Sequence, residues 1–103
     1  MARPGKSSRL SLSSKPKTLA AQALGRIDAR TGSLIPPIYP AVQYARNGDG
    51  SIRDGRSYTR DDNPTYELVE ELLATLEHGS ASMLFSSGMA AATTVFETLR
   101  LGD

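Results

Sequence analysis

Two short segments of this sequence hold residues whose types and spacing suit the binding of a phosphate group. The first spans residues 85–90, FSSGMA, where a predicted strand leads into a predicted helix. A helix start exposes unpaired backbone N–H groups, and a glycine there lets an anion approach the backbone closely. The spacing matches neither GxxxxGK[ST] nor GxGxxG. A purely structural reading stays open, in which Gly88 closes a tight turn and Ser87 caps the helix.

The second segment spans residues 57–60, SYTR. Arg60 offers a planar fork of donors that matches a phosphate or a carboxylate, and the Tyr58 phenol can donate a hydrogen bond or move a proton. The structural alternative is a surface ion pair between Arg60 and Asp61 or Asp62. Neither segment is decisive when it is taken separately.

A helix is predicted between the two segments, from Asn63 to Gly79. Asn63 is a suitable N-cap, Pro64 fits the first helical position, and Gly79 stands where a left-handed C-terminal cap is expected. Apolar residues recur at i, i+1, i+4, i+5 and i+8, which places them on one helix face. They are Leu68, Val69, Leu72, Leu73 and Leu76.

Further elements are predicted on either side of this helix. Residues 82–85 suit one buried strand, and residues 89–99 suit a largely buried second helix. Residues 18–24 predict a short helix that Gly25 stops. Between them, residues 26–60 contain a glycine or proline every few positions, which predicts a long extended arm with turns at 47–48 and 49–50. Arms of this kind are usually functional loops or segments that lie on a partner chain.

Composition excludes several classes of protein. The 103 residues suffice for one domain at most, and no stretch approaches the roughly 18 apolar residues of a membrane span. There is no cysteine and only one histidine, so neither a disulfide scaffold nor a zinc cluster is expected, and the cytoplasm is the expected compartment. Residues 1–17 hold five basic residues and no acid. They are expected to form a disordered leader, with a transit peptide or a phosphate-binding arm as alternatives.

Taken in order, five blocks of the chain resemble the amino-terminal part of a known enzyme family. The blocks are IPPIYPAVQY, YTRDDNPT, LVEELLATLEHG, MLFSSGMAA and LRLGD. The family is the cysteine and methionine metabolism, or trans-sulfuration, family of pyridoxal-phosphate enzymes, and the sequence looks most like its cystathionine gamma-synthases and gamma-lyases. The resemblance covers roughly residues 18–103.

The resemblance implies a role for particular residues. In the family, the tyrosine and arginine of a YxR motif reach into the active site of the neighbouring subunit and hold the phosphate of pyridoxal 5'-phosphate, which corresponds to Tyr58 and Arg60. A Ser-Gly-Met turn gives backbone N–H groups to the same phosphate, which corresponds to Ser87, Gly88 and Met89. The tyrosine also assists proton movements, so Tyr58 is the candidate catalytic side chain. No metal is implied.

The fold implied by the resemblance is α/β. Residues 1–17 would be the basic leader, residues 18–62 the arm with its short helix, and residues 63–103 the start of the large cofactor-binding domain of a fold-type I enzyme. A single strand leaves the sheet of that domain incomplete. The only lysines are Lys6, Lys15 and Lys17, so the family's Schiff-base lysine is missing and the chain is expected to be an inactive amino-terminal fragment.

The function implied is gamma-replacement or gamma-elimination on an activated homoserine or cystathionine, a small amino-acid substrate. The full-length form is expected to be a homo-oligomer, a tetramer of paired dimers, with no nucleic-acid or membrane partner. Two other hypotheses stay open. One is a non-catalytic module that docks on full-length relatives, and the other is a basic-tailed binder of phosphate or nucleic acid.

Overall fold

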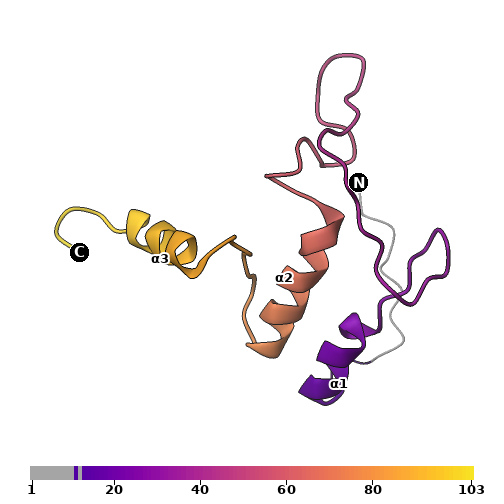
Figure 1. The fold of residues 1–103 in the computed structure, drawn as a ribbon. Helices are drawn as coiled ribbons and strands as arrows, with labels where there is room; N and C mark the ends of the chain where they lie inside the picture. Colours follow the sequence, from indigo (N-terminus) through magenta and orange to yellow (C-terminus); the bar gives the residue numbers. More distant parts are fainter. Residues whose placement is uncertain (1–10, 12) are drawn as a thin grey trace.

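The computed structural model describes residues 11 and 13–103, and its regular structure is helical (Figure 1). The helices are α1 (Pro16–Ala21), the 3-10 helix η1 (Ala23–Gly25), α2 (Pro64–Leu76) and α3 (Gly88–Glu97). The described residues form no β-sheet, and isolated antiparallel bridges pair Gln43 with Tyr58 and Arg46 with Ile52. The α/β sheet predicted from the sequence is therefore not confirmed. No helix among these residues has the length and apolar character needed to cross a membrane.

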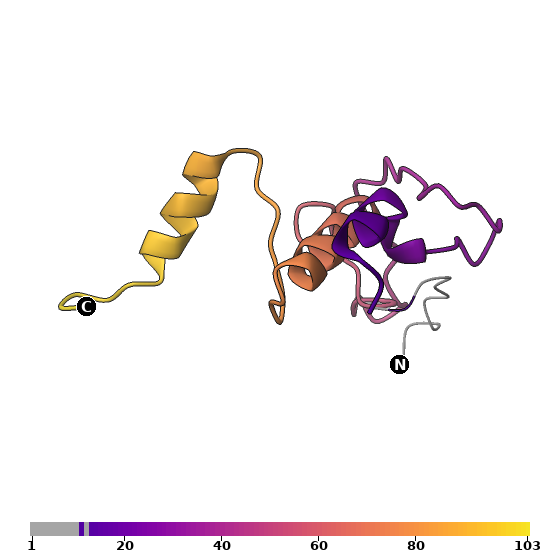
Figure 2. The same cartoon turned by 90° about the horizontal axis from the view of Figure 1, so that it is seen from below.

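The small core lies where α1 and η1 pack against α2 (Figures 1 and 2). Leu19 and Leu24 are each only 3% exposed. Pro16 occupies the start of α1, where its missing N–H costs nothing. The predicted helix over 18–24 is in fact broken, because Leu24 takes a left-handed φ of 58° inside η1. This kink turns Leu24 into the core and redirects the chain toward the arm.

Helix α2 begins and ends at specific caps. The Asn63 side chain accepts a hydrogen bond from the Thr65 N–H at 2.8 Å, which confirms the predicted N-cap. At the other end the prediction for Gly79 is wrong, because His78 is the residue with the left-handed φ, at 55°. The Gly79 N–H donates to the Ala74 carbonyl at 2.8 Å, which closes a Schellman motif one position earlier than predicted.

The arm between η1 and α2 is irregular, as predicted, and folds back on itself. Isolated bridges pair Gln43 with Tyr58 and Arg46 with Ile52. Only one turn closes the tip, instead of the two predicted: the Asn47 N–H donates to the Ser51 carbonyl at 3.0 Å. The turn uses Gly50 at a φ of 81°, which an L side chain rarely adopts. These contacts bring residue 58 back beside residue 43.

The segment that follows α2 departs most from prediction. Residues 82–85 form no strand, and polar contacts to α2 hold them instead: Ser82 Oγ donates to the Glu70 carbonyl at 2.6 Å, and the Leu84 N–H donates to Glu70 Oε1 at 2.8 Å. A strand needs a neighbouring strand to satisfy its backbone, and none lies beside it among the described residues.

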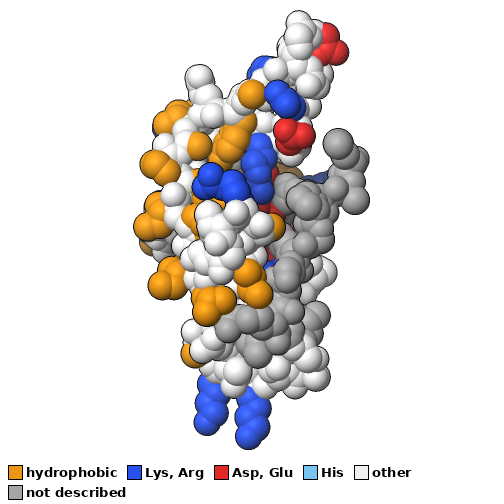
Figure 3. Space-filling model, turned by 90° about the vertical axis from the view of Figure 1, so that its right-hand side faces the viewer, with side chains coloured by type: hydrophobic (Ala, Val, Ile, Leu, Met, Phe, Trp, Pro, Cys, Tyr) orange, Lys and Arg blue, Asp and Glu red, His pale blue; other side chains and the backbone are white. Residues whose placement is uncertain are grey.

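Helix α3 projects away from the α1–α2 unit and contacts no other helix (Figure 2). Its predicted burial is wrong: Val95 is 64% exposed and Phe96 is 68% exposed. Apolar side chains are also exposed on the arm, where Ile35 and Ile38 are among the most accessible, and hydrophobic side chains gather along one border of the molecule (Figure 3). The apolar pattern of α3 is therefore that of a helix that no other helix of residues 13–103 covers.

Candidate functional site

The segment 57–61 is held at its middle residue, Thr59. The Thr59 N–H donates to the Val42 carbonyl at 3.0 Å, and the Tyr66 hydroxyl donates to the Thr59 carbonyl at 2.8 Å. The Thr59 hydroxyl accepts a hydrogen bond from Asn63 Nδ2 at 2.8 Å. Backbone and side chain of this one residue are thus fixed by the arm and by the start of α2.

On either side of Thr59 stand two of the predicted site residues. Tyr58 is half-buried and Arg60 is exposed, and the Arg60 guanidinium lies 6.0 Å from the centre of the Tyr58 ring. This is the outer range of a cation–π contact. The ion pair considered as an alternative is not formed, since Asp61 accepts from Ser57 Oγ at 3.2 Å and Asp62 pairs with Arg56. Arg60 forms no ion pair with any described carboxylate.

The other predicted site residues lie at the start of α3. Ser87 Oγ accepts a hydrogen bond from the Ala90 N–H at 3.1 Å, so Ser87 is an N-cap, as the structural alternative supposed. The first two helical residues, Gly88 and Met89, have N–H groups with no acceptor inside the helix. Gly88 has no left-handed φ, and a Cβ placed on it would meet nothing within 4 Å. Neither backbone strain nor packing against the described residues therefore requires glycine at position 88.

The structure does not bring these two groups of residues together within one chain. Helix α3 lies well apart from the segment 57–61 in both ribbon views (Figures 1 and 2). Tyr58 and Arg60 form one group, and Ser87, Gly88 and Met89 form another.

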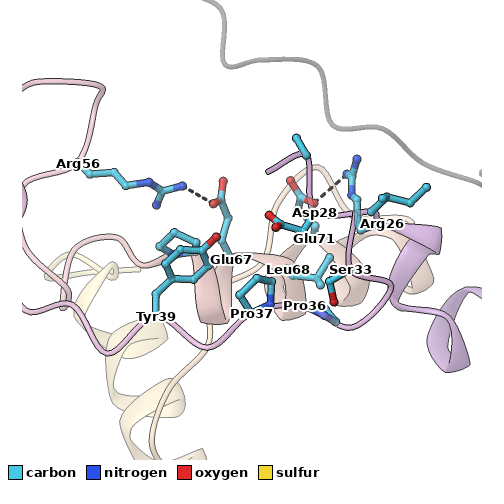
Figure 4. Close-up of a pocket in the computed structure, with 13 residues that line it drawn as sticks. Arg26, Asp28, Ser33, Pro36, Pro37, Tyr39, Arg56, Glu67, Leu68 and Glu71 are labelled. Atoms are coloured by element: carbon cyan, nitrogen blue, oxygen red, sulfur yellow. Dashed lines mark hydrogen bonds and ion pairs between the residues drawn. The ribbon is translucent and has the colours of Figure 1, made fainter. Parts of the chain in front are cut away.

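Sequence reasoning missed a pair of arginines that join the arm to α2. Arg26 Nη2 lies 2.9 Å from Glu71 Oε2, and Arg56 Nη2 lies 2.6 Å from Glu67 Oε2. Between them is a cavity of about 310 Å³ whose apolar lining includes Leu68 (Figure 4). The signal that could have found them is the acidic run of α2, although periodicity alone would place these glutamates on a solvated face. Two of its carboxylates, at one-turn spacing, instead face the arm.

The charge of Arg56 is strongly favoured in this setting. Burial by itself lowers the pKa of the guanidinium, but the hydrogen bond and the charge of Glu67, together with Asp62, outweigh that effect. The net pKa is raised above its usual value, so Arg56 stays a cation at any pH at which the fold persists.

The Tyr66 hydroxyl, which anchors Thr59, gives this region a pH dependence. Burial raises the pKa of Tyr66, and the charge of Asp62 adds to the rise. The folded state therefore keeps the phenol proton more tightly than the unfolded state. The resulting stabilisation is complete below the unfolded pKa of about 10 and is lost as the pH rises through the folded pKa.

We accordingly expect the urea midpoint of unfolding to fall as the pH rises above the ordinary tyrosine pKa of about 10, with Tyr66→Phe falling less steeply over the same range. Titrations of both proteins at intervals across the range provide the measurement. An alkaline decline of equal steepness in the phenylalanine variant would contradict the assignment to Tyr66.

The comparison with known proteins identifies the class and then the family. Residues 17–103 match the model of the Cys/Met metabolism PLP-dependent enzymes, so the cofactor class is pyridoxal phosphate. The chain belongs to this Cys/Met metabolism family, which confirms the resemblance noted from the sequence. The family implies the fold-type I architecture, of which the described residues form helices and arm but no sheet.

Named relatives agree with the family model. The chain is 40% identical over 92 residues to a cystathionine gamma-synthase/O-acetylhomoserine (thiol)-lyase of Bacillus subtilis, covering 89% of this chain and 24% of the relative. It is 42% identical over 91 residues to a cystathionine gamma-synthase of Mycobacterium tuberculosis, covering 87% and 24%. It is also 44% identical over 80 residues to an L-methionine gamma-lyase of Pseudomonas deceptionensis, covering 70% and 20%. The chain thus spans between a fifth and a quarter of the length of these relatives.

Proposed function

We propose that this chain is the amino-terminal part of a trans-sulfuration enzyme that uses pyridoxal phosphate to replace or eliminate the gamma substituent of an activated homoserine or of cystathionine. The observation that supports this most is the family match over residues 17–103, together with relatives named as cystathionine gamma-synthases. The substrate is then a small amino acid. We place the enzyme in the cytoplasm, in keeping with the absence of cysteine.

The residues present fit the phosphate of the cofactor. Arg60 supplies an exposed cation with no described carboxylate partner, and the space over Gly88 is open to an anion. We assign Arg60 and Tyr58 to one side of the phosphate, with the backbone N–H groups of Gly88 and Met89 on the other, where Ser87 fixes the turn by capping α3. The cofactor, when bound, supplies an electron sink for charge that develops on the substrate.

Tyr58 is the group we assign to proton movement. Its phenol can donate to or accept from a substrate atom, and its ring supports the Arg60 guanidinium at 6.0 Å. In this arrangement Tyr58 both positions the cation and acts at the substrate.

The separation of the two groups of residues supports an assembly of several chains. Since α3 lies apart from the segment 57–61, each chain can give Tyr58 and Arg60 to a neighbour and receive the neighbour's pair at its own Gly88 turn. We therefore propose a homo-oligomer, organised as a tetramer of paired dimers. In the same proposal the 103 residues by themselves are inactive, because Lys6, Lys15 and Lys17 all precede the arm and none suits the Schiff-base role.

A comparison of two ligands tests the phosphate assignment. Pyridoxal 5'-phosphate and pyridoxal share the ring and the aldehyde and differ in the phosphate, so the ratio of their dissociation constants isolates the phosphate contacts. The titration follows absorbance or fluorescence of the complete polypeptide that carries this chain. A ratio close to one would overturn the phosphate site and with it the proposed function.

The variant Gly88→Val tests the assignment of the Gly88 turn through the same ratio of dissociation constants. The open space around Gly88 and its ordinary φ predict that the variant folds with its free energy of unfolding changed by less than about 0.5 kcal/mol. The added side chain would, however, crowd an anion that approaches the Gly88 N–H. We expect the preference for the phosphorylated ligand to fall about tenfold, the scale of one charge-assisted hydrogen bond. An unchanged preference would favour a simple turn.

A further inference from the structure

Arg56 is a strongly shielded cation of the arm that the proposed function leaves without a role. Its Nη1 donates to Asp62 Oδ1 at 2.5 Å and its Nη2 donates to Glu67 Oε2 at 2.6 Å. The side chains of Arg56, Asp62 and Glu67 are 17%, 23% and 18% exposed, so this cluster is shielded from water on most sides. Ion pairs with such shielding fix geometry better than exposed ones.

This cluster lies where it can hold the segment 57–61 in place. Arg56 precedes the segment 57–61 and Asp62 follows it, so their ion pair joins the two ends of the segment that presents Tyr58 and Arg60. Glu67 lies in the first turn of α2, a helix of 13 residues with a cap at each end. The bonds at Thr59 hold the middle of the segment. The Arg56 bonds hold its ends against a rigid element (Figure 4).

Three arginines of the arm differ in their ion-pair partners and in their exposure. Both Nη atoms of Arg56 are engaged by carboxylates, so it is unsuited to binding an anion as well. Arg53 pairs with Asp54 at 3.5 Å, but their side chains are 60% and 73% exposed. Arg60 has no described carboxylate partner and is exposed. Arg60 is therefore available for a phosphate, whereas the half-buried Arg56 is engaged by carboxylates beside the segment that presents Arg60.

We propose that Arg56 is a positioning residue: by bridging Asp62 and Glu67 it fixes the segment 57–61 so that Arg60 meets the cofactor phosphate. This inference rests on the proposed function and adds to it a residue outside the motif. Arg56 itself touches neither cofactor nor substrate.

The test uses the ratio of dissociation constants for pyridoxal and pyridoxal 5'-phosphate, measured on the complete polypeptide. Arg56→Gln is expected to lower the preference for the phosphorylated ligand about tenfold, the size common for groups that orient a binding residue. Arg53→Gln is the matched control. Arg53 lies three positions before Arg56 and belongs to an exposed ion pair, so this variant removes the same charge at a neighbouring position. It is expected to leave the ratio unchanged. An unchanged ratio in Arg56→Gln would overturn the inference.

A double variant distinguishes positioning from a general structural defect. If Arg56 acts through Arg60, then Arg56→Gln placed on an Arg60→Ala background is expected to lower the ratio by less than about twofold further. A further tenfold loss on that background would overturn the positioning role. An Arg60→Ala variant that by itself keeps the full ratio would overturn the proposed function as well, so the two failures are separable.

The variant Arg56→Lys keeps a positive charge beside the two carboxylates. It provides a second test of the inference if the glutamine variant does not fold. A single ammonium cannot reproduce the fork that spans both carboxylates. We expect it to lower the ratio about threefold, between the parent and the glutamine variant. A lysine variant with the parent's ratio would overturn the inference, because charge alone would then suffice.

Discussion

Replacing Arg60 with alanine is expected to weaken the binding of pyridoxal 5'-phosphate by about 1.5 to 3 kcal/mol, the range for hydrogen bonds to a charged group. This corresponds to about 10- to 150-fold in the dissociation constant. The reason lies in the arm: Arg60 is exposed, rests 6.0 Å from the Tyr58 ring and has no described carboxylate to compete with a phosphate. Equilibrium titration of the complete polypeptide measures the effect.

The same titration with pyridoxal is the internal control for Arg60→Ala. Because that ligand lacks the phosphate, its affinity should change little. Arg53→Ala is the control for lost charge, since Arg53 is paired with Asp54 in solvent. Equal weakening of both ligands would point to a damaged fold and would count against a phosphate contact.

Replacing Asn63 with alanine is expected to lower the free energy of unfolding by about 2 to 4 kcal/mol. Loss of the N-cap of α2 accounts for about 1 kcal/mol, and the acceptors left without their donor account for the rest. Asn63 is only 5% exposed, and its Nδ2 donates to the Tyr39 carbonyl at 3.1 Å and to Thr59 Oγ1 at 2.8 Å. One side chain thus joins the arm, the segment 57–61 and α2. Urea titration measures the change.

Two further variants separate the contribution of the N-cap from the contribution of the hydrogen bonds that Asn63 Nδ2 donates. Asn63→Asp keeps an acceptor for the Thr65 N–H but removes the Nδ2 donor, so we expect a loss between that of alanine and zero. Ser87→Ala removes the exposed cap of α3, which has one bond at 3.1 Å, and is expected to cost about 0.5 to 1 kcal/mol. A cost for Asn63→Ala no larger than that for Ser87→Ala would show that the contacts to Tyr39 and Thr59 add nothing.

The helices could be predicted from local chemistry. Asn63 and Pro64 mark the start of α2 because a capping amide and a missing N–H act within one turn of the chain. Ser87 marks the start of α3 for the same reason. The C-terminus of α2 was predicted one residue off, because a histidine accepts the left-handed conformation that glycine was expected to take. A Cβ on Gly79 would lie 3.4 Å from the Ala81 carbonyl oxygen, an ordinary van der Waals distance, so packing does not require glycine there either.

The errors in the fold came from elements that need distant partners. The apolar pattern of residues 82–85 and of α3 predicts burial, yet Met83 is 74% exposed and Phe96 is 68% exposed. Periodicity reports which face of an element is apolar, and burial depends on whether another element covers that face.

The candidate site divides in the same way. The residue types of the segments 57–60 and 85–90 predicted a phosphate site, and their order along the chain predicted the enzyme family. The match over residues 17–103 confirms the family. That these two segments bind the phosphate remains our proposal. The ion pairs of Arg56 with Asp62 and Glu67 were not predicted, because the acidic residues of α2 read as a solvated face when only the helix is considered.

The sequence by itself therefore determined the family, the helix boundaries to within a few residues and the residues proposed to meet the phosphate, since each depends on side-chain type and short-range spacing. Only the tertiary structure decided that Arg60 has no described carboxylate partner while Arg56 is engaged on both sides. It also decided that α3 lies apart from the segment 57–61. The physical reason is that ion pairing and burial are properties of groups brought together from remote parts of a chain, which local patterns do not specify.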